Sequence, residues 1–444
     1  MVSPQLDSAE RTHLGLGDPG AVVAALGNSP ISNAISDWLI PGNRYRGSGI
    51  DTVRSELDAG SHDSAHLAEY LAGSSIIHCG DAWSYVGRAL EAGTRGDPNA
   101  AIHLAYYASL RAALSLLATE GVGVLNGRTF VVETSGACSL VPKPTLPKQR
   151  RGTHVMTWLA IQDWANQPRS LAVLGEIVRP FGERLTRWLA ALPSPPVTRL
   201  ASAILLNWGA DLQRVASDQV LRNAASYDPS SINGDVPLGT RDAGEFVSTW
   251  WRLFEPSAPS PFDNLDRHLL RLFLEQALAQ SPVSDSELVK IINGAGMSSR
   301  LASTKPFLAR TTSSLDPTLL TQARRPPTVG DPAPHFPVIA RASLLARIAS
   351  GSVAMLLNSA GLSRADIEFW WVERLRQRGI WDLSPILDPA TDLWPDVDDA
   401  IQSIDSWLAT PRSDGTFHSM IDALAGDLWV IGGGERVSAW SLDL

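Results

Sequence analysis

The chain has 444 residues, of which 44% are hydrophobic and 19% charged, and 37 basic against 46 acidic side chains give a net charge of −9. This length predicts two or three domains, and this hydrophobic fraction excludes intrinsic disorder. The apolar runs are too short to span a bilayer and no secretion signal is recognisable, so we expect a cytoplasmic protein without a membrane segment. Two cysteines, Cys79 and Cys138, are too few for a zinc module or a disulfide framework, and we expect free thiols.

Helical patterns dominate the N-terminal part of the chain. Asp97 can cap a helix and Pro98 suits a first turn, so a helix is expected from there to about residue 119. Its centre is apolar on nearly all sides, which is typical of a helix inside a bundle. Apolar spacings of three and four predict an antiparallel partner helix at 81–95. A β-branched run around an Asn-Gly turn predicts a small β-hairpin at 124–134.

The remainder of the chain is also expected to be mainly helical. Proline-rich stretches at 255–261 and 324–337 predict boundaries, and two β-like runs around a glycine turn predict a terminal hairpin at 429–441. The fold class is therefore mainly α, with multi-helix bundles in two or three segments. Helices are expected at 153–166, 169–191, 196–225, 241–255, 263–280, 338–358, 363–378, 395–409 and 417–428.

These boundaries divide the chain into helical segments joined by proline-rich stretches. The segments comprise an N-terminal one at 1–141, a basic Pro-rich loop at 142–151, helical segments at 152–255 and 262–323, and a C-terminal one, with its hairpin, at 338–444.

The scarcity of lysine excludes several classes of enzyme. None of the lysines follows a glycine, so a phosphate-binding Walker A loop is absent. None lies two residues after an acid or a histidine, which excludes the common restriction-type nuclease core and the His-x-Lys phosphodiesterase motif. The paired motifs of zinc deaminases and the Gly-x-Ser-x-Gly nucleophile elbow are also missing.

One helix carries a resemblance to a known family. The sequence Tyr-Tyr-Ala-x-x-Arg-Ala-Ala begins at Tyr106, and the surrounding segment 81–130 resembles the helical HEPN-type domains of bacterial toxin and phage-defence proteins. The resemblance covers roughly 50 residues and implies a helical bundle and a role in anti-phage defence. HEPN ribonucleases carry an Arg followed five residues later by a His, and no His here has an Arg at that offset. Ribonuclease activity is therefore not implied.

The best polar constellation lies on the same helix. His103, Tyr107 and Arg111 are four residues apart and share one stripe of an otherwise apolar helix. As a site they would bind phosphate or carboxylate, with Arg111 as the anion-binding fork and His103 as a proton carrier. The alternative is a buried hydrogen-bond network that locks the bundle. His154 is a further catalytic candidate.

Two weaker patterns would suit a metal ion. His62 and His66 would chelate a metal if they shared one face of a helix. Asp392, Asp396 and Asp399 would hold Mg²⁺ from one helical face. The alternatives are solvent-facing histidines and an acidic helix start. No cofactor is predicted.

The basic loop predicts a contact with nucleic-acid phosphates through Lys143, Lys148, Arg150 and Arg151, and the alternative is a solvated linker. The 15 tryptophans occur mostly in helical contexts, which favours packing and protein interfaces over ligand cages.

The sequence therefore predicts a non-catalytic interaction or scaffold subunit of a cytoplasmic multi-protein assembly, with protein partners. A place in anti-phage defence is implied by the resemblance alone. The alternative is a nucleic-acid-cleaving or nucleotide-processing enzyme with a site around His103, Arg111 and His154.

Overall fold

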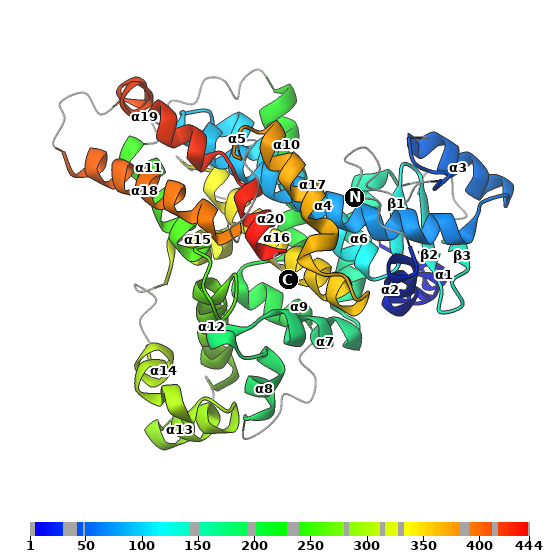
Figure 1. Cartoon of the computed structure of the whole chain (residues 1–444), viewed down its shortest axis with the longest axis horizontal. Helices are drawn as coiled ribbons and strands as arrows, with labels where there is room; N and C mark the ends of the chain where they lie inside the picture. Colours follow the sequence, from blue (N-terminus) through cyan, green and yellow to red (C-terminus); the bar gives the residue numbers. More distant parts are fainter. Residues whose placement is uncertain are drawn as a thin grey trace.

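A computed structural model shows a mainly α-helical protein, as the sequence predicts, with one small sheet (Figure 1). The described residues are 5–29, 42–47, 49–142, 151–192, 201–228, 239–278, 284–310, 316–326, 333–381, 390–410 and 416–442.

The N-terminal part is organised around two long antiparallel helices. The Asp97 side chain accepts the backbone N–H of Ala100 at 2.9 Å and caps the second of them, as expected. The first begins after Asp63 and is much longer than the predicted 81–95. The helices here are α1 (Ser8–Leu14), α2 (Pro19–Gly27), α3 (Gly49–Ala59), α4 (Ser64–Thr94) and α5 (Pro98–Thr119).

A three-stranded antiparallel sheet follows α5. Strands β1 (Val122–Leu125) and β2 (Arg128–Val132) form the predicted hairpin, and Gly127 takes the positive φ of 74° that its turn requires. A third strand, β3 (Cys138–Leu140), which the sequence pattern does not predict, pairs with β2.

The middle of the chain breaks into shorter helices than the apolar pattern predicts. Gly209, with a φ of 96°, ends α9, and Asp211 caps α10, so the expected helix at 196–225 is two helices. The elements are α6 (Thr153–Ala165), α7 (Pro168–Ile177), η2 (Pro180–Gly182), α8 (Leu185–Ala190), α9 (Ala201–Trp208), α10 (Leu212–Tyr227), α11 (Thr240–Leu253), α12 (Asp263–Leu278), α13 (Asp285–Gly294), η4 (Ser298–Arg300), α14 (Leu301–Leu308) and α15 (Thr318–Arg324).

The C-terminal part begins with a long, mostly buried helix and returns to the centre of the molecule (Figure 1). Its elements are α16 (His335–Ser359), α17 (Arg364–Gln377), η6 (Ala390–Leu393), α18 (Trp394–Ala409), α19 (Phe417–Ile431) and α20 (Glu435–Ser441).

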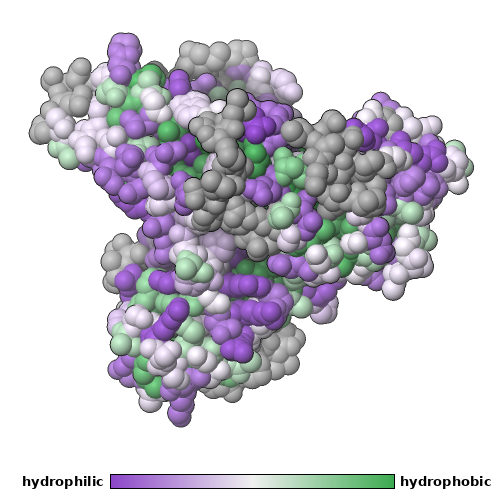
Figure 2. Space-filling view, viewed as in Figure 1, coloured by the Kyte–Doolittle hydropathy of each residue, from purple (hydrophilic) through white to green (hydrophobic). Residues whose placement is uncertain are grey.

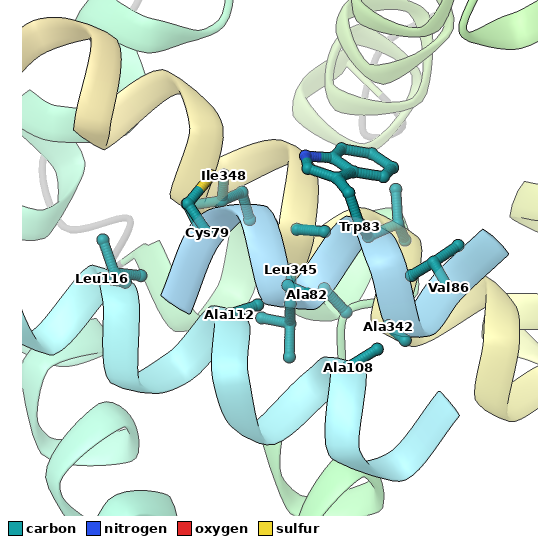
Figure 3. Close-up of a cluster of buried hydrophobic side chains, with 14 of the residues drawn as sticks. Cys79, Ala82, Trp83, Val86, Ala108, Ala112, Leu116, Ala342, Leu345 and Ile348 are labelled. Atoms are coloured by element: carbon teal, nitrogen blue, oxygen red, sulfur yellow. The ribbon is translucent and has the colours of Figure 1, made fainter. Parts of the chain in front are cut away.

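The core lies where α4, α5 and α16 pack together. Figure 3 shows Ala82 of α4, Ala108 and Ala112 of α5 and Ala342 of α16 facing one another, with Leu345 between the helices. These small side chains let the helix axes approach closely, and larger residues fill the flanks. By length and composition α5 and α16 would be long and apolar enough to cross a membrane, but most of each is buried inside the protein.

Two buried ion pairs connect α16 to its neighbours. Arg341 donates to both carboxylate oxygens of Asp218 on α10, at 2.9 and 2.6 Å. Arg347 contacts Asp266 on α12 in the same two-pronged manner, at 3.1 and 2.7 Å, and also donates to the carbonyl of Ile177 at 2.6 Å. Buried charges require such partners.

The predicted C-terminal hairpin is wrong, because residues 429–441 form the end of α19, a glycine junction and α20. The junction lies against α4. A Cβ on Gly434 would stand 2.1 Å from the carbonyl oxygen of Trp83, and one on Gly87 would stand 2.3 Å from the backbone nitrogen of Gly434. These glycines therefore allow two backbone segments to approach closely, and they do not form the turn of a β-hairpin.

Several tryptophans lie in the core, as their helical contexts predict, including both members of the pair Trp250–Trp251 and one member of the pair Trp370–Trp371. Trp250, Trp251 and Trp371 are at most 1% exposed. On the face shown in Figure 2, hydrophilic side chains dominate and hydrophobic ones form small, scattered patches.

Candidate functional site around Arg222

Three of the four catalytic candidates meet in one cluster between α5, α6 and α10. The ring of Tyr107 lies 5.0 Å from that of His103 and 6.0 Å from that of His154, centroid to centroid. Two further side chains complete the cluster, Tyr106 from α5 and Arg222 from α10. We call these five residues the Arg222 cluster.

A chain of hydrogen bonds fixes the orientation of His154. The indole N–H of Trp158 donates to the hydroxyl of Tyr106 at 3.2 Å, and that hydroxyl lies 2.8 Å from Nδ1 of His154. An indole nitrogen can only donate, so the tyrosine oxygen accepts from Trp158, and the tautomer of His154 decides which group donates in the contact with Nδ1. We assign the donor role to the tyrosine hydroxyl, which places the proton of neutral His154 on Nε2, where it is available to a ligand.

Arg222 is a buried cation in an aromatic setting. The residue is only 6% exposed, and its guanidinium carbon lies 5.2 and 5.4 Å from the ring centroids of Tyr106 and Tyr107. Its Nε is buried without a hydrogen-bond partner among the described residues. Asp218, one helical turn earlier, is occupied by Arg341. No described carboxylate forms an ion pair with Arg222, and the two aromatic faces offset only part of the cost of burying its charge.

The electrostatics of the cluster follow from this cation. Burial, and then the Arg222 guanidinium, lower the pKa of both His103 and His154 below the usual value for histidine. Burial raises the pKa of Tyr106. At neutral pH the cluster therefore contains one positive charge, two neutral imidazoles and two phenols, which is a set suited to an anion.

His103 lies at the outer edge of the cluster. Its Nδ1 is 2.8 Å from the hydroxyl of Ser226, four residues after Arg222 on α10. The contact joins the N-terminal half of α5 to the C-terminal half of α10. Ser226 is exposed, so this edge of the cluster faces solvent.

An open groove of about 930 Å³ runs between α6 and α10, and its described lining does not include the five residues of the cluster. Trp158 connects the two, because it lines the groove and donates to Tyr106. The two helices run antiparallel, since Gln162 donates to the carbonyl of Leu212 at one end, at 3.3 Å, while His154 and Arg222 both contact Tyr106 at the other. This volume lies within the range of ligand-binding pockets.

The fourth candidate, Arg111, points to another part of the molecule. It donates to Nδ1 of His78 at 2.9 Å and lies 3.8 Å from Asp81, both on α4. Asp81 also pairs with Arg374 of α17. Burial and the charge of Arg111 lower the pKa of His78 to about 4, so this imidazole stays neutral. Arg111 belongs to a satisfied network, and the predicted set of His103, Arg111 and His154 does not assemble.

The structure gives the metal candidates no support. His62 precedes the cap of α4 and contacts the carbonyl of Cys138 at 3.0 Å, so it does not share a helical face with His66. Asp392, Asp396 and Asp399 are exposed. Among the described residues, no group of three or more His, Cys, Asp or Glu side chains could hold a metal ion.

The basic loop falls largely outside the described residues, which omit Lys143, Lys148 and Arg150. Arg151 is described, and it pairs with the buried Glu10 and donates to the carbonyl of Gln5. Its guanidinium therefore ties the start of α6 to the N-terminal segment.

The two cysteines, Cys79 and Cys138, are free and buried, as expected, and burial raises the pKa of each thiol to about 12. At neutral pH both remain protonated, which disfavours nucleophilic chemistry.

Sequence reasoning missed Arg222, although α10 carries a signal for it. The buried positions of this helix include Leu212, Val215, Asp218 and Arg222, at spacings of three, three and four. A charged residue on the inward stripe of a helix must find a partner in the protein or bind one from outside.

No protein-family model, curated protein or solved structure matches the chain.

Proposed function

We propose that this chain is a non-catalytic interaction subunit that recognises an anionic group, carboxylate or phosphate, through Arg222. The observation that carries the proposal is a buried guanidinium without a carboxylate partner among the described residues. A bound anion would supply the missing counter-charge.

The surroundings of Arg222 support binding more than turnover. Its neighbours are two neutral histidines and two tyrosines, and burial raises the pKa of Tyr106, so that phenol acts as a hydrogen-bond donor rather than as a nucleophile. His154 can donate its Nε2 proton to the same anion. The enzyme hypothesis also needs Arg111 beside these residues, but its guanidinium is held against α4 by His78.

The resemblance of 81–130 to HEPN-type domains suggests the setting. We propose a cytoplasmic multi-protein assembly in anti-phage defence as the context in which the anion is recognised, and this part rests on the resemblance alone.

Sulfate titration tests the proposal, because sulfate stays doubly charged across the useful pH range. We expect the wild-type protein to bind sulfate with a measurable heat, and Arg222→Gln to lose this binding. Arg222→Lys keeps the charge but loses the planar fork, so its affinity should be intermediate. Circular dichroism would show that each variant is folded.

Arg241→Gln is the matched control, because it removes one charge from an exposed arginine on α11. Equal sulfate binding by the wild type and Arg222→Gln would contradict the proposal. Turnover of a phosphate ester that disappears in His154→Ala would instead favour an enzyme.

A further inference from the structure

A second set of basic side chains lies in the part of the molecule formed by α8, α12, α13, α14 and the short helices η2 and η4, at the lower end in Figure 1. Arginines here with an acidic partner include Arg184 and Arg187, which pair with Glu176 and Glu183 at 2.9 Å. Unpaired cations on a surface attract anions. Four exposed basic residues of this part form no ion pair with a described residue, and these are Arg179, Lys290, Arg300 and Arg310.

Two phenylalanines bring arginines from different elements together. The ring centroids of Phe181 and Phe307 lie 5.9 Å apart. The guanidinium carbon of Arg267 lies 4.7 Å from the ring centroid of Phe181, and that of Arg310 lies 4.7 Å from the ring centroid of Phe307. Arg300 donates to the carbonyl of Phe181 at 3.1 Å. These arginines therefore surround one pair of rings.

Arg179 lies at the same place, because it precedes Phe181 by two residues. Its Nε donates to the carbonyl of Glu176 at 3.3 Å, and no described carboxylate forms an ion pair with its guanidinium. Arginines from η2, α12, η4 and the end of α14 thus meet around the two rings. We give the name Phe181 patch to Arg179, Phe181, Arg267, Arg300, Phe307 and Arg310.

The Phe181 patch is strongly positive. Its four arginines have one acidic partner among the described residues, the buried Asp263, which pairs with Arg267. Burial, and then the charges of Arg271, Arg310 and Arg267, lower the pKa of His268 to about 4. This imidazole is therefore neutral at pH 7, and its lowered pKa agrees with a positive potential at this surface.

The backbone of Phe181 is held in a conformation that side-chain-bearing residues rarely adopt. Its φ is 58°, and no other non-glycine residue in the described ranges has a positive φ. The hydrogen bond from Arg300 to its carbonyl and the packing of its ring on Phe307 hold it there. Strain of this kind is concentrated at functional sites.

We infer that the Phe181 patch binds the phosphate backbone of a nucleic acid. Its guanidinium groups come from separate elements, so they match a row of phosphates better than a single anion. Arginine suits this role because its planar group donates two hydrogen bonds to one phosphate. This site is separate from the Arg222 cluster.

A membrane surface fits the Phe181 patch less well. Insertion into lipid needs exposed apolar side chains. The exposed large hydrophobic residues of the described chain lie on other elements, and these are Leu16, Ile50, Leu206, Val220, Tyr227 and Trp429.

Fluorescence anisotropy of the full-length protein with a labelled DNA of about 20 nucleotides, single-stranded and duplex, tests the inference. About four phosphate contacts predict that the affinity for the duplex falls about 100-fold between 50 and 200 mM salt. We expect the double variant Arg179→Gln with Arg300→Gln to bind about tenfold more weakly or worse at 50 mM salt. The slope of log affinity against log salt should also decrease by about two.

Three single variants serve as controls. Arg300→Lys keeps the charge and should bind DNA within about threefold of the wild type, because an ammonium group also neutralises a phosphate. Arg241→Gln removes an exposed charge on α11, and Arg222→Gln removes the cation of the other site, so both should bind DNA normally. Circular dichroism would show that each variant is folded.

Unchanged DNA binding by the double variant, or binding that does not depend on salt, would overturn the inference. Loss of binding in Arg222→Gln with normal binding by the double variant would also overturn it, in favour of the Arg222 cluster. Tighter binding to phosphatidylserine vesicles or to polyglutamate than to either DNA would overturn it in favour of a membrane or an acidic protein. Sulfate titration tests the proposed function separately, so failure of the Phe181 patch to bind DNA leaves that proposal standing.

Discussion

At the scale of single residues, burial lowers the pKa of several histidines, most of all that of His335. His335 begins α16, is fully buried and has no hydrogen-bond partner for either ring nitrogen among the described residues. Burial lowers its pKa to about 3, from an ordinary value of 6.5. Between these two values the unfolded chain binds more protons than the folded one, so the free energy of unfolding falls as the pH falls.

Replacing His335 should remove its contribution to the fall in the free energy of unfolding at acid pH. At pH 5 the wild-type protein has lost about 2 kcal/mol through His335, because 1.5 pH units below 6.5 correspond to that free energy. We expect His335→Leu to gain stability over the wild type by this amount between pH 8 and pH 5, as measured by urea unfolding. If the two proteins differed in free energy of unfolding by the same amount at pH 8 and pH 5, the lowered pKa of His335 would be contradicted.

We expect the affinity of the Arg222 cluster for an anion to depend on pH. Arg222 and burial lower the pKa of His103 and His154, and a bound anion would counter the charge of Arg222 and favour their protonation. Tyr106, Tyr107 and Arg222 are the other titratable groups of the cluster that face His154. Sulfate affinity should therefore rise as the pH falls from 7.5 to 5.5. An affinity independent of pH would exclude a direct role for these histidines.

At the scale of helices, small residues and ion pairs decide how elements meet. Local patterns predict α5, because Asp97 and Pro98 mark its start and its apolar content marks its buried position. The junction of α19 and α20 could not be predicted in this way. A glycine run between β-like residues is compatible with a hairpin, and only the approach of Gly434 to Gly87 identifies it as a helix contact.

An alanine at this contact should destabilise the fold. Gly434→Ala would place a Cβ 2.1 Å from the carbonyl oxygen of Trp83, and we expect a loss of about 1–3 kcal/mol or more from overpacking, measured by thermal and urea unfolding. Gly426→Ala is the control, because Gly426 lies inside α19 with open space around it. That change should stabilise the protein by about 0.5–1 kcal/mol. Equal effects of the two changes would refute the close contact.

Removing only one partner of the buried ion pair between Arg347 and Asp266 should strongly destabilise the protein. Asp266→Ala leaves a buried guanidinium without its carboxylate, and we expect a loss of about 3–5 kcal/mol in urea unfolding. The double variant Arg347→Met with Asp266→Leu should recover much of this loss, because it removes both charges. Asp285→Ala, which breaks an exposed pair with Lys305, should cost less than about 1 kcal/mol. A double variant as unstable as the single one would contradict this account.

At the scale of the whole molecule, one hydrophobic cluster contains residues from Leu6 to Leu442. It includes residues from each of the helical segments that the proline-rich stretches delimit, and α16 from the C-terminal part packs on α4 and α5 from the N-terminal part. The proline-rich boundaries of the sequence thus separate stretches of chain that share a core. The division of the chain into folding domains stays a prediction.

A fragment tests whether the N-terminal segment is independent. Residues 1–141 lack α16 and α20, so the faces of α4 and α5 that carry Ala82 and Ala112 would be exposed to water. We expect this fragment to show no cooperative thermal transition by circular dichroism and the full chain to show one. A sharp transition in the fragment would establish an independent N-terminal domain.

The sequence alone determined the helical class, the hairpin after α5 and the burial of most tryptophans, because capping, turn chemistry and apolar periodicity act within a few residues of the chain. It also singled out His103, Tyr107 and His154. Only the tertiary structure decided that Arg222 joins these residues and that Arg111 does not. It also decided that the glycine junction between α19 and α20 packs closely against α4. These outcomes depend on how helices distant in the chain pack together, and a buried charge takes its partners from that packing rather than from its sequence neighbours.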